Sequence, residues 1–163
     1  MRTDTIPAPI DLVKSAFDTS RFSVWGPDEI IKDASTMIVE LREQVWSNYL
    51  EYETEFNDKV IKILINDTEE LEKSNEKTAI EVFWEKNSEL LYELQKSTTN
   101  SRRSRAGKVF EEIFQLVLNA AQIPYDTQGK IGKSRFVDYG LGKLVDFVVP
   151  NAETFQVQKR NCV

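Results

Sequence analysis

Apolar side chains recur at three- and four-residue intervals over much of the first hundred residues, and this spacing is the strongest constraint on the fold. The longest run follows Pro27-Asp28-Glu29 and consists of Ile30, Ile31, Ala34, Ile38, Leu41, Val45, Trp46, Tyr49 and Leu50. Such spacing gathers the apolar side chains on one face of a helix, and proline and acids are typical of a first helical turn. We therefore expect an amphipathic helix from residue 27, then two or three further helices, after an irregular segment over the first thirty residues.

After residue 100 the pattern changes to one strongly apolar helix followed by short β-like segments. We expect this helix over residues 109–121, behind a basic approach at residues 101–108. Four of the six glycines mark turns between three segments with the composition of strands, at residues 123–125, 134–137 and 143–150. The sequence thus predicts an α+β protein with an acidic helical region at residues 1–99 and a partial α/β core at residues 100–163.

The two regions carry opposite net charge. Residues 1–99 hold 11 Lys and Arg against 21 Asp and Glu, whereas residues 100–163 hold 10 against 6, within a total charge of -6. A basic portion in an acidic chain indicates a polyanionic partner for that portion. The acidic region is interpreted as a small bundle or docking platform, with DNA mimicry or a dimerisation surface at Trp46, Trp84 and Tyr92 as open alternatives.

The composition excludes several classes of protein. The chain has no histidine, so the usual base of serine and cysteine nucleophiles and the commonest zinc ligand are both missing. Its chemistry must use carboxylates, lysines or hard metals. Its single cysteine, Cys162, has no intramolecular partner, and no apolar run approaches the roughly 18 residues of a membrane span. The first seven residues, Met1 to Pro7, lack the basic-then-apolar order of a secretory signal, so we expect a cytoplasmic protein without membrane association.

Two groups of residues are candidates for a site. Four cations lie within seven residues, namely Arg102, Arg103, Arg105 and Lys108, and arginine pairs bidentately with phosphate or with guanine edges. The alternatives are a solvated basic loop or salt bridges to the acidic region. Asp146 stands in an apolar segment, where it must face water at a strand end or be held by a cation or metal. Glu111 and Glu112 are expected to open the apolar helix, where acids suit the helix dipole.

Two further motifs fail on their spacing. Gly132-Lys133-Ser134 resembles the end of a P-loop, but the first glycine of that motif would fall on Thr127, so nucleotide hydrolysis is rejected. Lys159 follows Asp146 as a nuclease lysine would, but Val157 stands where that motif has an acid.

Two parts of the sequence together resemble the EcoRII/PspGI-like branch of type II restriction endonucleases, within the PD-(D/E)xK nucleases. They are Arg102-Arg103-Ser104-Arg105-Ala106-Gly107-Lys108 with Glu111, and then Val145-Asp146-Phe147-Val148-Val149-Pro150. The resemblance covers residues 100–163. It implies a restriction-endonuclease-like core, sequence-specific cleavage of double-stranded DNA, Mg²⁺ as cofactor and a homodimer. It also implies roles for six residues: Arg102 contacts DNA, Arg103 and Arg105 read bases, Lys108 holds phosphate, Glu111 assists catalysis, and Asp146 is catalytic and binds the metal.

Members of that family continue with a strand that bears a catalytic lysine, and Asn161-Cys162-Val163 resembles its opening. We therefore expect a chain truncated at the C-terminus and inactive alone, because the mechanism needs both a metal and a lysine at the phosphate. The alternative is a non-catalytic DNA-binding or protein-interaction module, from which metal dependence distinguishes the nuclease.

Overall fold

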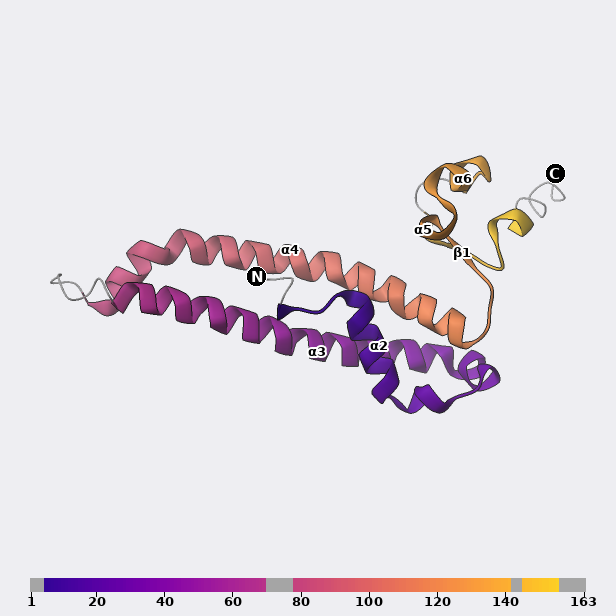
Figure 1. Ribbon diagram of the computed structural model, residues 1–163, viewed down its shortest axis with the longest axis horizontal. Coiled ribbons are helices and arrows are strands. Elements are labelled where there is room, and N and C mark those ends of the chain that lie inside the picture. The colour runs from indigo at the N-terminus through magenta and orange to yellow at the C-terminus, as the bar shows by residue number, and fades with distance from the viewer. Residues whose placement is uncertain (1–4, 70–77, 142–144, 156–163) are drawn as a thin grey trace.

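The computed structural model describes residues 5–69, 78–141 and 145–155, and two long helices form its frame. Helices α3 (Pro27–Glu69) and α4 (Ala79–Ala120) run antiparallel along the length of the molecule (Figure 1). α3 begins at Pro27 with Asp28 and Glu29 in its first turn and is kinked at Asp33. α4 begins with a capping box, in which the Thr78 side chain and Glu81 satisfy each other's backbone N–H groups. The amphipathic helix expected from residue 27 is therefore present.

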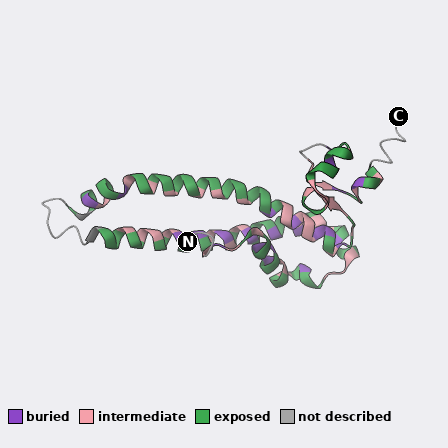
Figure 2. Ribbon diagram, turned by 45° about the horizontal axis from the view of Figure 1, so that its top comes forward, coloured by how far each residue is buried: buried purple, intermediate pink, exposed green. Residues whose placement is uncertain are grey.

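Helix α2 (Pro9–Thr19) and the short 3-10 helix η1 (Arg21–Val24) pack against the paired helices. The prediction of an irregular first thirty residues was wrong, because Leu12, Val13 and Ala16 of α2 are buried in the main core. The core also takes side chains from both long helices, among them Met37, Leu41, Val45, Tyr49, Val109 and Ile113. Buried residues are concentrated near α2. The C-terminal end of α3 and the N-terminal end of α4, which lie away from α2, are mostly exposed (Figure 2).

The basic segment is part of α4 and does not precede a new helix. The helix continues without interruption through residues 100–108, so the expected helix start at residue 109 was wrong. Arginine and alanine are good helix formers, and Gly107 has a low helix propensity. Because Gly107 is exposed, its missing side chain leaves no gap in the core. The boundary at residues 99 and 100 thus separates charge but not secondary structure, and the division into two domains stays a prediction.

A small second unit follows α4 and contains β1 (Asp126–Thr127), α5 (Gln128–Ile131), α6 (Lys133–Asp138) and β2 (Phe147–Val148). The two strands pair antiparallel, Asp126 with Val148 and Thr127 with Phe147. This sheet beside helices confirms the α+β prediction. The expected strand at residues 134–137 is wrong, because these residues lie in α6, where Phe136 is fully buried and β propensity is overruled by packing. The strand expected at residues 143–150 is reduced to β2, and residues 142–144 lie outside the described part.

No helix among the described residues has both the length and the apolar composition to cross a membrane.

Candidate functional site

An open groove of about 970 Å³ lies between the C-terminal part of α4 and the small second unit. Residues far apart in the sequence meet there, because Lys108 and Glu111 come from α4 and Asp146 from the segment before β2. The remaining lining residues are Glu112, Gln115, Asn119, Tyr125, Thr127, Gln128, Gly129, Lys130, Lys133 and Phe147. Three of the six residues selected from the sequence therefore share one groove.

Lys108 is held on the α4 wall of the groove by acidic residues one turn further along the helix. Its Nζ donates to Glu111 Oε2 at 2.8 Å and lies 3.5 Å from Glu112 Oε1. The hydrogen bond to Glu111 is the main cause that raises the pKa of Lys108 above 10.5. The expectation that Glu111 and Glu112 open a helix was wrong: they lie well inside α4, where they pair with Lys108 and do not interact with the dipole at a helix N-terminus.

Asp146 is exposed and lies immediately before β2, which is the strand-end position that one of the two interpretations predicted. The segment is fixed on both sides of the aspartate. The Gln128 side-chain amide donates to the carbonyl oxygen of Val145 at 3.1 Å, and the Phe147 ring lies 5.2 Å from the ring of Phe114 on α4. The backbone around Asp146 is therefore anchored to both walls of the groove.

The carboxylates of Asp146 and Glu111 are the kind of ligand that Mg²⁺ prefers, but they are few. Among the described residues, no three His, Cys, Asp or Glu side chains are grouped to hold a metal ion. Mg²⁺ requires near-octahedral coordination and gives up its water reluctantly. The described residues therefore match the chemistry of Mg²⁺ ligands but are too few to hold the ion by themselves. Lys159 lies outside the described residues, as does Cys162.

The three arginines of the basic segment have different surroundings. Arg102 donates from Nε to Oε2 of Glu53 on α3 at 2.8 Å, and its NH2 group donates to the same oxygen. Arg105 donates from NH1 to the carbonyl oxygen of Pro7 at 2.7 Å, and its guanidinium lies 5.3 Å from the centre of the Tyr49 ring. Arg103 is exposed and has no hydrogen bond or ion pair with another described residue. The predicted salt bridge to the acidic region is thus real for Arg102.

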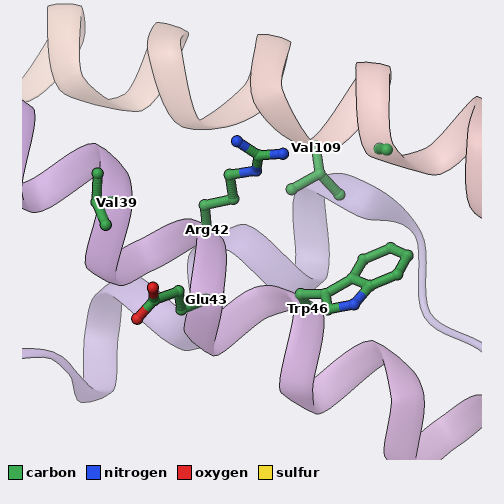
Figure 3. Close-up of a pocket in the computed structure, with 6 residues that line it drawn as sticks. Val39, Arg42, Glu43, Trp46 and Val109 are labelled. Carbon is green, nitrogen blue, oxygen red and sulfur yellow. The ribbon is translucent and has the colours of Figure 1, made fainter.

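Sequence reasoning missed a second cavity, of about 320 Å³, between α3 and α4 (Figure 3). Arg42 and Trp46 extend from α3 and Val109 from α4, and the wall is completed by Val39, Glu43 and Ala106. Trp46 had been considered for a dimerisation surface, but it is half-buried with its ring 5.3 Å from that of Tyr49. The i,i+4 spacing of Arg42 and Trp46 was the available signal, since it places both on one helix face.

Lys130 and Lys133 were also not predicted as groove residues. The Gly132-Lys133-Ser134 motif had been noted only as a failed P-loop, and Lys133 instead begins α6 with its side chain at the groove. Gly132 before it has φ 89°, a left-handed conformation that disfavours other residues and permits the tight link between α5 and α6.

The fold and the groove define a restriction-endonuclease-like α+β protein. Two solved structures of metal-depleted Ecl18kI are similar to this chain, each with a TM-score of 0.81 and 33% sequence identity. One holds uncleaved DNA, and the other holds uncleaved, modified DNA. Each match covers 98% of this chain and 52% of the Ecl18kI chain.

The model of the family described as EcoRII C terminal matches residues 69–160, and the chain belongs to this family. It is also 37% identical over 153 residues to the type II restriction enzyme SsoII of Shigella sonnei, which covers 94% of this chain and 50% of SsoII. The chain therefore spans about half the length of the relatives it matches, and the resemblance stated from the sequence is confirmed.

Proposed function

We propose that this chain is the DNA-binding portion of a magnesium-dependent, sequence-specific type II restriction endonuclease that hydrolyses phosphodiester bonds of duplex DNA. The observation that carries the proposal is the groove, because it joins Lys108 of α4 to Asp146 beside the small sheet. Lys108, Lys130 and Lys133 offer its walls donors for a phosphate backbone, beside the carboxylates of Glu111, Glu112 and Asp146. The similarity to Ecl18kI, which was solved with DNA, supports the same assignment.

Within this proposal the cations have separate tasks. Lys108 holds a phosphate, and Arg103, which has no partner among the described residues, reads a base edge. Arg105 is the second base-reading residue, although this role requires it to leave the carbonyl oxygen of Pro7 and the ring of Tyr49. Replacing Arg103 and Arg105 together by alanine should abolish discrimination of a specific duplex, at roughly 1–3 kcal/mol per lost bidentate contact. Equal binding of cognate and scrambled duplexes by the unmutated chain would contradict this assignment.

We further propose that Asp146 is one Mg²⁺ ligand and that Glu111 supports it. Since two carboxylates give few oxygen donors to an ion that prefers six, the chain should bind Mg²⁺ weakly and cleave no DNA alone. Calorimetric titration with Mg²⁺ measures the first expectation, and Asp146→Ala should remove the weak binding. Incubation with plasmid and Mg²⁺ measures the second. Discrete fragments that disappear in Lys159→Ala would instead show that Lys159 completes a catalytic centre.

A non-catalytic DNA-binding or protein-interaction module is the second candidate function. It is favoured by the absence of a three-ligand metal group among the described residues. Anisotropy titration of a fluorescent duplex with and without Mg²⁺ separates the candidates. The endonuclease proposal predicts that Mg²⁺ changes binding by the unmutated chain and not by Asp146→Ala, whereas a purely non-catalytic module predicts identical titrations for both.

We also propose a homodimer, formed along the part of the long helices that lies away from α2. Large apolar side chains on α4 are exposed there, namely Ile80 at 80%, Trp84 at 63% and Tyr92 at 64% of their surface. An isologous interface would cover this strip with its own copy. Sedimentation equilibrium should give twice the monomer mass, and Trp84→Glu should return the protein to the monomer.

A further inference from the structure

The buried carboxylate of Glu53 lies directly beside the basic segment. Glu53 is on α3, within the acidic region, and only 1% of its surface is exposed. Its Oε1 accepts a hydrogen bond of 2.5 Å from the Tyr49 hydroxyl, and its Oε2 accepts both donors of Arg102. A buried charge without a partner is strongly unfavourable, whereas a buried charge that is paired is tolerated. Glu53 therefore depends on Arg102.

Arg102 does not depend on Glu53 to the same extent. Its side chain is 48% exposed, against 2% for the side chain of Glu53. Solvent or a DNA phosphate could satisfy the guanidinium equally well. Any phosphate that captured Arg102 would, however, take both Arg102 donors away from Glu53 Oε2 while the carboxylate stayed buried. Because Glu53 is buried, separating Arg102 from it is unfavourable in free energy.

The position of this ion pair relates it to DNA binding. Arg102 lies one helical turn before Ala106, and Glu53 lies two turns after Trp46, so both extend the helix faces that line the cavity between α3 and α4. Arg103, the proposed base reader, is adjacent in sequence. Arg102 is therefore within the segment to which the proposed function assigns DNA contact, and its charge is already neutralised there.

We propose that Glu53 is a specificity-determining residue that withholds Arg102 from sequence-independent phosphate contacts by keeping it in an ion pair with α3. The inference rests on the proposed function. Phosphate contacts contribute affinity for every duplex, whereas base contacts distinguish one sequence from another. Fewer available phosphate contacts lower binding to unrelated DNA, and this raises the ratio of specific to non-specific binding.

The experiment measures how the binding constant of the full chain for a fluorescent mixed-sequence duplex depends on salt. Each phosphate contact contributes about 0.9 to the slope of log K against log salt concentration. Glu53→Gln frees Arg102 and should steepen the slope by about 0.9, Arg102→Gln should leave it unchanged, and the double variant should return to the wild-type slope. A residue with a merely structural role would not make the slope steeper when mutated.

Glu55→Gln is the matched control, because the substitution removes the same charge from the same helix, α3. Glu55, however, is exposed and paired with Lys59. Equal steepening in Glu53→Gln and Glu55→Gln would overturn the proposal, since it would then reflect net charge alone. An unchanged slope in Glu53→Gln, or a slope reduced by Arg102→Gln, would also overturn it. Failure of the unmutated chain to bind the duplex would instead contradict the proposed function.

If a variant does not fold, the proposal can still be tested by NMR on the unmutated protein. In arginine Nε–H NMR spectra, addition of the duplex should shift the resonance of Arg103 and leave that of Arg102 in place. A duplex-induced shift of Arg102 equal to that of Arg103 would overturn the proposal.

Discussion

Replacing Arg102 by alanine tests the energetics of its ion pair with Glu53 directly. The change removes both donors to Glu53 Oε2, whereas the hydrogen bond from the Tyr49 hydroxyl to Oε1 and the other contacts of Glu53 remain. The hydrogen bond to Glu53 is also the main cause that raises the pKa of Arg102 from its ordinary value, so the folded protein favours the charged form of Arg102. Loss of Arg102 should therefore destabilise the folded protein.

The exposure of the two partners sets the expected magnitude. Breaking a fully buried pair costs about 3–5 kcal/mol, whereas exposed pairs contribute up to about 1 kcal/mol. Glu53 is buried but the Arg102 side chain is 48% exposed, so the pair is only partly withdrawn from water and falls between these two cases. We expect a loss of about 2–3 kcal/mol, between these limits. For a chain of this size the loss lowers the melting temperature by roughly 4–12 °C.

Urea and thermal denaturation followed by circular dichroism measure this loss, with Arg103→Ala as the control. Arg103 is the same residue type at the next position of α4, is exposed, and should change stability by less than about 0.5 kcal/mol. Replacing both Glu53 and Arg102 by methionine should recover most of the loss, because apolar residues replace buried pairs at little cost. Equal stabilities of Arg102→Ala and Arg103→Ala would refute the reasoning.

Two further predictions concern Tyr49 and the acidic region. Burial, followed by the hydrogen bond to Glu53, raises the pKa of Tyr49 above 10.0, so its contribution to stability is complete below pH 10.0 and is lost as the pH rises through the raised value. The urea midpoint should therefore fall above pH 10.0, and less steeply in Tyr49→Phe; identical pH profiles would count against this. The exposed Trp84 should not contact the phosphate backbone, because its region carries the excess of acids, and photo-cross-linking of bromo-substituted DNA to Trp84 would contradict this.

The sequence predicted those parts of the fold in which pattern and packing agree. Apart from the exposed Ile31, the apolar residues after Pro27 form the buried face of α3, and the acids at its start lie in the first turn. Prediction from the sequence failed where packing overrules a local conformational preference. Residues 134–137 have the composition of a strand but form part of α6, because burial of Phe136 in the small second core decides their conformation. The paired strands are two residues long, which leaves little periodicity to detect.

The sequence selected three of the residues that line the groove, but it did not predict their contacts. Lys108, Glu111 and Asp146 were selected from the sequence and meet at one groove. Lys130 and Lys133 were missed because no pattern connects α5 and α6 to α4. The partner of Arg102 is 49 residues away on another helix, and Glu53 is one of 21 acids in its region. Burial distinguishes Glu53 from the other described acids of that region.

Burial of the acidic partner, and not the presence of an ion pair, should decide which cations of α4 are available to DNA. Lys108 and Arg102 are both paired, and their side chains are almost equally exposed, at 51% and 48%. Glu111, however, is 35% exposed and stays solvated when Lys108 leaves it, whereas Glu53 does not. We therefore expect Lys108→Ala to reduce the salt slope by about 0.9 and Arg102→Gln to leave it unchanged, which gives about 0.9 for the two paired cations. A combined reduction of about 1.8 would show that both contact phosphate, whatever their partners.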